Sequence, residues 1–302
     1  MIKYNKVLVT GGSGFVGCRL QRLKPEWIYV SSKDCDLTDR EACRRLFEHH
    51  KPDAVIHLAA KVGGIKESSN NQAEFYYKNT MINMNVVHEA YRAGVKRLLA
   101  SLSTCCFPDV SETYPMLEEG ILSGQPTETN FCYGHSKRVL YIQINAYREC
   151  YGVDYSTFCP SNLYGPENNF DLDKSHFVSS MIRKFSEAKD NDTIEFWGSG
   201  TPLRQQLYID DLTKIIVLLL EKHHSNLPLI VAPNENISIK QMIDICLEVT
   251  SKNLNIKFNN KLDGQYRKDG SNKRLLDLIG DFEFTTFKEG LSETCRWYDE
   301  QE

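Results

Sequence analysis

The 302-residue sequence predicts an α/β fold, in which a doubly wound parallel sheet carries helices on both faces. Two observations predict it. Short apolar runs alternate with longer amphipathic segments from residue 6 to residue 160. The short runs are apolar almost throughout instead of alternating with polar residues, which is typical of parallel strands that are covered on both faces.

Each element of this half follows from a local pattern. The apolar runs predict strands over 6–10, 27–31, 53–60, 96–103 and 154–160. The amphipathic segments predict helices from residue 15, over 38–50, over 71–93 and over 133–152. Thr38 and Glu41 have the spacing of a capping box, so we expect Thr38 to begin the second helix. Gly94 and Gly152 are well placed to end the two long helices.

The alternation loosens after residue 162. A polar loop over 162–176 precedes expected helices over 177–189, 211–224, 238–250 and 287–302, with a strand–turn–strand segment over 193–211. We therefore assign 1–162 to a cofactor-binding domain. Residues 163–302 mainly form a smaller α/β lobe over the carboxyl ends of the strands, with some segments returning to the first domain.

Composition narrows the class of protein. The net charge is −4, with 41% hydrophobic and 25% charged residues, which is typical of a soluble globular protein. No basic patch predicts a nucleic-acid partner, and no apolar run approaches the roughly 20 residues that span a bilayer. The start shows no signal-peptide pattern, and the ten cysteines are scattered without CxxC pairs, so we expect free thiols in the cytoplasm. The eight histidines show no metal-binding spacing, and no metal is expected.

Glycines at 11, 14 and 17 follow the first strand and open a helix. Glycine allows a tight turn there and lets backbone N–H groups approach a pyrophosphate at the helix N-terminus. In this strand–turn–helix–strand context, the spacing predicts a Rossmann-type dinucleotide site.

The end of the second strand favours NADP(H) over NAD(H). Ser31, Ser32 and Lys33 come first and can hold a 2′-phosphate, whereas an acidic residue there is usual for NAD. The expected cofactor-binding residues are Gly11, Gly14, Phe15, Val16, Gly17, Ser32, Lys33, Asp36, Leu37, Ala59, Ala60, Tyr133, Lys137, Pro160, Asn162, Leu163 and His176.

A Y-x-x-x-K pattern places Tyr133 and Lys137 on one face of a helix. We expect the Lys137 ammonium to lower the pKa of the phenol, so that Tyr133 can donate a proton beside a nicotinamide. Ser103, at the end of the fourth strand, can hydrogen-bond the same carbonyl oxygen. His57 lies within the third strand and is interpreted as a core residue.

These motifs, with "HLAAKVGGI", resemble the extended short-chain dehydrogenase/reductase superfamily. The segments "LSTCCFP", "PSNLYGPENNF", "SHFVSSMIRKF", "FWGSGTPLRQQLYIDDL" and "DGQYRKDGSNKRL" are similar, within it, to the GDP-L-fucose synthase family. Its members are GDP-4-keto-6-deoxy-D-mannose epimerase–reductases that use NADPH. The resemblance covers residues 4 to 300 without a large insertion.

The resemblance implies a role for each matching residue. Cys105 is the base that removes the protons at C3 and C5 of the keto sugar, and His176 is the acid that returns them. Ser103, Tyr133 and Lys137 serve reduction of the 4-keto group. Cys106, which follows the base directly, is interpreted as a packing residue.

The residues that face the GDP-sugar in this family match Trp197 and Arg204 here, and Lys184 stands where some members carry arginine. We expect these three and Arg274 to bind the substrate. Arg204 suits the diphosphate because a planar guanidinium binds phosphate well. Lys268, Lys273 and Arg274 lie close together, and which of them reaches the phosphates stays open at this point. The family also implies a homodimer, expected through the helices over 71–93 and 133–151.

Three alternatives remain. An epimerase–reductase acting on a related keto-deoxy sugar, such as a colitose precursor, would keep Cys105 and His176. A 4-epimerase or dehydratase with tightly bound NAD would favour an acidic end to the second strand. A catalytically silent NADPH-binding regulator would be indicated by loss of Tyr133 or Lys137, and both are present.

Overall fold

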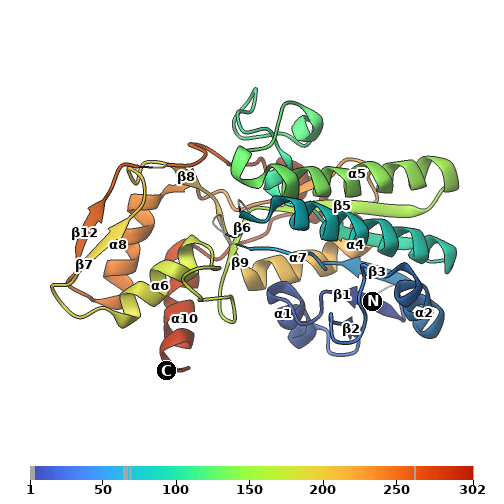
Figure 1. The fold of residues 1–302 in the computed structure, drawn as a ribbon, viewed down its shortest axis with the longest axis horizontal. Coiled ribbons are helices and arrows are strands. Elements are labelled where there is room, and N and C mark those ends of the chain that lie inside the picture. Colours follow the sequence, from blue (N-terminus) through green and yellow to red (C-terminus); the bar gives the residue numbers. More distant parts are fainter. Residues whose placement is uncertain (1–3, 64–66, 68–69, 262, 302) are drawn as a thin grey trace.

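A computed structural model describes residues 4–63, 67, 70–261 and 263–301. It shows a sheet domain with a smaller lobe beside it, and the lobe carries β7, β12, α6, α8 and α10 (Figure 1). The segment "HLAAKVGGI" quoted above extends to positions 64 and 65, which lie outside the described residues.

The main sheet has six parallel strands, which confirms the predicted doubly wound fold. In spatial order they are β2 (Ile28–Val30), β1 (Val7–Thr10), β3 (Ala54–His57), β4 (Arg97–Ser101), β5 (Asp154–Pro160) and β10 (Leu229–Val231). The chain reverses direction across the sheet between β1 and β3. In folds of this kind, ligands bind outside the carboxyl ends of the strands at such a point.

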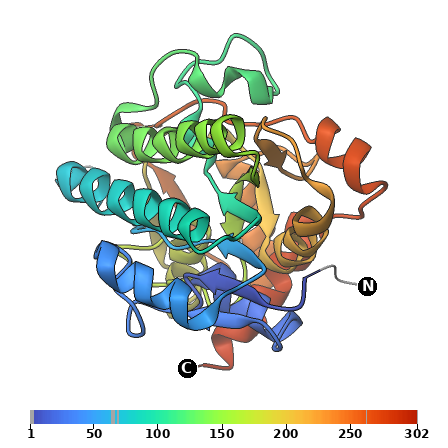
Figure 2. The ribbon, with the colours of Figure 1, turned by 90° about the vertical axis from the view of Figure 1, so that its right-hand side faces the viewer.

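Helices cover both faces of this sheet (Figure 2). One face packs against α2 (Arg40–His50), α4 (Gln72–Arg92) and α5 (Phe131–Tyr151). The other packs against α1 (Phe15–Leu23), α7 (Ile209–Lys222) and α9 (Lys273–Ile279). Leu8 of β1 enters the first core, and Val7 and Val9 enter the second. Burial on both faces explains why the strands read as continuous apolar runs.

The lobe encloses its own core between helices and short strand pairs. Its helices are α6 (Phe177–Glu187), α8 (Ile239–Thr250) and α10 (Phe287–Asp299). The paired strands are β7 (Thr193–Phe196) with β12 (Asn255–Phe258), β8 (Leu203–Arg204) with β11 (Ile237–Ser238), and β6 (Asn162–Tyr164) with β9 (Gln206–Tyr208). Three 3₁₀ turns, η1 (Thr104–Cys106), η2 (Glu118–Leu122) and η3 (Glu128–Asn130), lie between β4 and α5.

Several sequence expectations change at this level. The Thr38 capping box is wrong, because the carboxylate of Asp39 accepts from the first-turn amides of α2 and begins the helix one residue later. The polar loop expected from 162 begins with β6, and β10 supplies a sixth strand from the second half of the chain. Gly94 and Gly152 follow their helices with φ of +79° and +65°, which confirms the predicted ends.

All ten cysteines of the chain are free thiols. Within the described residues, no helix has both the length and the apolar character needed to cross a bilayer.

Arg97 ties the sheet to the end of α7. Its side chain is 1% exposed. The guanidinium donates to the carbonyls of Leu219, Leu220 and His223 at 3.0, 2.9 and 3.0 Å. These carbonyls close the last turn of α7, where a helix leaves acceptors unpaired and favours a positive charge. One residue of β4 thereby holds α7 on the sheet.

We expect Arg97→Met to lower the free energy of unfolding by about 3 kcal/mol or more, because several buried carbonyls would lose their donors. Urea unfolding followed by circular dichroism measures this change. The exposed Arg45 of α2 provides the matched control, and Arg45→Met should unfold at nearly the wild-type urea concentration. Equal stability of both variants would contradict the assigned role of Arg97.

Candidate active site

The predicted site residues gather at one edge of the sheet. Parallel strands end at the same edge, so the segments that follow β1, β3, β4 and β5 meet there. These segments carry Gly11, Ala59, Ala60, Ser103, Pro160, Asn162 and Leu163.

The turn between β1 and α1 requires glycine at two positions. Gly11 has a φ of +77°, and a Cβ there would lie 2.8 Å from the backbone nitrogen of Ala59. A Cβ on Gly17 would lie 2.2 Å from the carbonyl oxygen of Gly11. Gly14 is the N-cap of α1, with Phe15 and Val16 half-buried in the first turn. This bare helix N-terminus fits a pyrophosphate.

The residues predicted to hold a 2′-phosphate follow β2. Ser32 and Lys33 are exposed there. The carboxylate of Asp36 accepts from the backbone N–H and the hydroxyl of Thr38, while Leu37 is buried. A cationic and hydroxyl-bearing end of β2 therefore lies next to the glycine turn, since β1 and β2 are neighbours in the sheet.

Ser103 and Cys105 share one tight turn after β4. Ser103 is the N-cap of η1, and its hydroxyl accepts from the N–H of Cys105 at 3.2 Å. The Ser103 side chain also helps lower the pKa of the Cys105 thiol and opposes the rise in the pKa of the Tyr133 phenol. All three residues are half-buried.

Lys137 is the buried member of the predicted pair. The residue is 2% exposed, and its ammonium donates to the carbonyl of Ser101 at 2.8 Å. Burial lowers the pKa of Lys137 to about 8. The expectation that Lys137 lowers the pKa of Tyr133 is wrong for this structure, since burial and the neighbouring thiols raise the pKa of that phenol. Tyr133 consequently keeps its proton at neutral pH.

The two adjacent cysteines have opposite environments. Burial raises the pKa of both thiols, but at Cys105 the charge of Lys268 and hydrogen bonds from Ser103 and Lys268 outweigh it and lower the pKa. Lys268 Nζ lies 3.2 Å from Cys105 Sγ. Cys106 is fully buried, and burial raises its pKa to about 12. Cys105 is therefore the more readily ionised of the two adjacent thiols.

His176 enters from the lobe as the N-cap of α6. Its side chain is accessible to solvent, although many protein atoms surround it. This crowding lowers the pKa of the imidazole, and the positive charge of Lys268 lowers it further. Lys268 thus influences both the proposed base and the proposed acid, which come from different parts of the chain.

The four predicted substrate residues are distributed over the lobe and the sheet edge. Lys184 of α6 lies over the ring of Phe196, 5.1 Å from its centre, and Trp197 is 66% exposed. Arg204 is half-buried, and its charge helps lower the pKa of Cys105. Arg274 is exposed and forms ion pairs with Glu118 and Glu119.

Of the three cations that the sequence left open, Lys268 contacts Cys105, whereas Lys273 pairs with Asp277 and Arg274 with the two glutamates. Sequence reasoning missed the contact between Lys268 and Cys105. No local pattern signals it, because 163 residues separate the two partners.

His57 is a core residue, as predicted. It is 1% exposed and hydrogen-bonds with Thr10 and Asn83. Among the described residues, no cluster of His, Cys, Asp and Glu side chains is suited to hold a metal ion.

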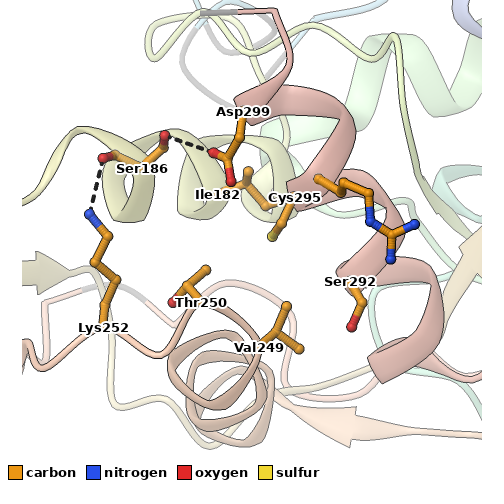
Figure 3. Close-up of a pocket in the computed structure, with 9 residues that line it drawn as sticks. Ile182, Ser186, Val249, Thr250, Lys252, Ser292, Cys295 and Asp299 are labelled. Carbon is orange, nitrogen blue, oxygen red and sulfur yellow. Dashed lines mark hydrogen bonds between the residues drawn. The ribbon is translucent and has the colours of Figure 1, made fainter.

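A cavity of about 550 Å³ lies elsewhere, between α6, α8 and α10 (Figure 3). Lys252 donates to the carbonyl of Ser186, and the hydroxyl of Ser186 donates to Asp299 across one side of it. None of the catalytic candidates lines this cavity. It belongs to the lobe and plays no part in the site described above.

Residues 7–231 match the NAD dependent epimerase/dehydratase family. A GDP-L-fucose synthase of Dictyostelium discoideum is 37% identical, over 97% of this chain and 94% of its own. A probable GDP-L-fucose synthase of Drosophila melanogaster is 35% identical, over 97% of each chain.

A solved structure shows the same similarity in three dimensions. The crystal structure of a GDP-L-fucose synthetase from Naegleria fowleri bound to NADP has a TM-score of 0.91 and 33% identity. The similarity covers 100% of this chain and 94% of that one. The fold, the lobe included, is therefore shared over the full length.

The glycine turn gives a direct test of the dinucleotide site. In Gly17→Ala the new methyl group would collide with the Gly11 carbonyl, so we expect a loss of NADPH binding and a destabilisation of about 1–3 kcal/mol. Fluorescence titration with NADPH and thermal unfolding measure the two effects. Gly120→Ala is the control, because a Cβ there meets no atom closer than 3.8 Å. Normal NADPH binding by Gly17→Ala would count against this site.

Proposed function

The chain belongs to the NAD dependent epimerase/dehydratase family and, within it, to the GDP-L-fucose synthase family, and we propose that it converts GDP-4-keto-6-deoxy-D-mannose to GDP-L-fucose. The reaction comprises epimerisation at C3 and C5, followed by NADPH-dependent reduction of the 4-keto group. The observation that carries this proposal is that Ser103 and Cys105 share one hydrogen-bonded turn beside Lys268, with Tyr133 close enough for its pKa to depend on both.

Epimerisation needs a base, an acid and a polarised ketone. Cys105 acts as the base, since Lys268 lies 3.2 Å from its sulfur and favours the thiolate, the form that can remove a proton from the carbon next to the ketone. The hydroxyls of Ser103 and Tyr133 donate to the ketone oxygen and stabilise the negative charge that develops there. His176 returns a proton to the carbon from the lobe side.

Reduction uses the same polarised carbonyl. Bound NADPH supplies the hydride to C4. Tyr133 gives its proton to the carbonyl oxygen, and its raised pKa ensures that the phenol carries this proton at neutral pH. Lys137, anchored to the Ser101 carbonyl, holds the helix that presents Tyr133 and lies where it can also orient the cofactor. One oxygen site thereby serves both steps.

The first part of the chain binds the cofactor, and the second part mainly binds the substrate. Residues 1–162 bind NADP(H) through the glycine turn, Ser32, Lys33, Asp36, Leu37, Ala59, Ala60, Pro160 and Asn162, and Leu163 adds a contact just beyond this range. Residues 163–302 mainly bind the GDP-sugar, with Lys184, Trp197 and Arg204 as its contacts. Arg274 joins them once it exchanges its glutamate partners for the substrate.

The protein works as a homodimer in the cytoplasm. Helices α4 and α5 lie side by side (Figure 1). Their exposed apolar side chains include Tyr77, Met84 and Ile142. Such a surface suits a two-fold interface in which each helix pair packs on its copy. Ten free thiols agree with a reducing compartment.

The two-step reaction is tested by turnover of GDP-4-keto-6-deoxy-D-mannose with NADPH in D₂O. We expect NADPH oxidation and deuterium at C3 and C5 of the product. In Cys105→Ser, deuterium incorporation should fall about a hundredfold or more, because a hydroxyl is a poor base at neutral pH. Mass spectrometry and NMR of the product locate the deuterium.

Cys106→Ser is the neighbouring control, and its deuterium incorporation should stay near that of the wild type. NADPH oxidation without deuterium would leave only a ketoreductase and remove Cys105 from the role of base. Turnover of a 3-deoxy keto sugar in place of this substrate would favour the colitose-type alternative.

The dimer is tested by light scattering after gel filtration. The wild type should have twice the 34.7 kDa mass of one chain. Ile142→Glu places a charge in the proposed interface and should yield monomer, whereas a charge at the exposed Leu172, which lies outside these helices, should not. A monomeric wild type would refute the interface.

A further inference from the structure

We infer that Lys268 is a positioning residue for proton abstraction: its ammonium pairs with the Cys105 sulfur and keeps it as the thiolate that acts as base. The inference rests on the proposed function, since it names a further residue of the same site. Of Lys268, Lys273 and Arg274, it assigns only Lys268 to proton abstraction.

The contact itself is the first observation. Lys268 Nζ lies 3.2 Å from Cys105 Sγ, a distance at which an ammonium donates a hydrogen bond to sulfur. Both side chains are half-buried, so water screens this pair less than it screens an exposed ion pair. A charge-assisted hydrogen bond of this kind stabilises the thiolate more than the neutral thiol.

The backbone around Lys268 is held on both sides. The N–H of Leu203 donates to the carbonyl of Tyr266 at 2.9 Å, and the N–H of Met116 donates to the carbonyl of Asp269 at 2.8 Å. The side chain of Gln205 also accepts from the N–H of Gly270 at 2.8 Å. Lys268 is therefore presented by a segment that is tied to both the lobe and the sheet domain.

The neighbours of Lys268 direct its side chain. Arg267 and Asp269 form an ion pair with each other at 2.5 and 2.9 Å, so they share one side of this extended segment. Side chains alternate in extended backbone, which leaves Lys268 on the opposite side. Since Arg267 satisfies Asp269, no adjacent carboxylate competes for the Lys268 ammonium.

Other charged and titratable groups also face Cys105. Arg204 adds a second positive charge from β8, but its effect on the thiol is weaker than that of Lys268. Tyr133, Cys106 and Cys159 lie nearby, and their neutral forms prevail at neutral pH because burial raises their pKa values. Lys268 is thus the strongest of these charged neighbours acting on the sulfur.

The proton balance is simple. The Cys105 thiolate takes a proton from the sugar carbon and becomes a thiol, while the electron pair moves to the polarised ketone oxygen. The Lys268 ammonium keeps all of its protons throughout. The same charge disfavours the protonated form of His176 and lowers its pKa, so the protonated imidazole is a stronger acid.

The test measures ionisation of Cys105 without substrate. Wild type, Lys268→Met and Lys268→Arg are alkylated with iodoacetamide across a pH series, and the peptide containing Cys105 is quantified by mass spectrometry. Cys105→Ser reports the background from Cys106 in the same peptide. We expect the alkylation curve of Lys268→Met to move to higher pH, and Lys268→Arg to restore it toward the wild-type position.

The second measurement is deuterium incorporation as a function of pH. In Lys268→Met both limbs of the profile should move to higher pH, because the charge acts on Cys105 and His176 in the same direction. Incorporation at pH 7 should fall roughly tenfold or more, part of the 10²–10⁴ that a general base contributes. Lys257→Met, which removes an exposed lysine of the lobe, should leave both curves unchanged.

NADPH binding and the unfolding midpoint show whether each variant folds, and Lys268→Gln provides a second charge removal if Lys268→Met does not. An unchanged alkylation curve in a folded variant would overturn the inference. A raised KM for the GDP-sugar with an unchanged curve would overturn it too and make Lys268 a diphosphate ligand. If the wild type incorporates no deuterium, the proposed function fails, while the alkylation series still decides the pairing.

Discussion

The hydrogen bond between Lys137 and the Ser101 carbonyl is the constraint on which the site depends. It joins the middle of α5 to the last residue of β4, and the ammonium is almost fully buried where it does so. A buried ammonium without an acceptor is costly, so α5 cannot slide along the sheet without losing this bond. Tyr133 lies one turn earlier on α5, and Ser103 lies two residues beyond β4, so the same bond brings phenol and hydroxyl together.

Charge and burial then set the protonation states of the thiols and the phenol in the site. Burial acts in the same direction on the thiols and the phenol, and it would keep all of them neutral. The exception is Cys105, where Lys268 and Arg204 bring positive charge to a half-buried sulfur. Cys106 differs from it by one position and by complete burial, and it stays a packing residue. The site thus contains one thiol with a lowered pKa beside one protonated phenol, which suit the proposed base of the epimerisation and the proposed proton donor of the reduction.

The second half of the chain contributes to both parts of the molecule. β10 and α7 return to complete the sheet domain, while β8 and the segment around Lys268 reach the site from the lobe. Buried hydrogen bonds hold these segments in place: Arg97 binds the end of α7, and Gln205 binds the backbone of Pro233 and Gly270. The site therefore forms only when both halves are folded against each other, although the motifs of the first half already carry the cofactor turn and the Tyr–Lys pair.

The sequence by itself determined the features that are written in local patterns. Apolar runs and amphipathic segments specify the strands and helices of the sheet domain. Gly11, Gly14 and Gly17 mark its turn, and larger residues would collide at Gly11 and Gly17. The spacing of Ser103, Cys105, Tyr133 and Lys137 is likewise local once β4 and α5 are recognised. Only the tertiary structure decided the short strand β10, the pairing of Arg274 with two glutamates, the raised pKa of Tyr133 and the contact of Lys268 with Cys105. Each of these depends on burial or on residues far apart in the chain, and neither is encoded in the spacing of neighbouring residues.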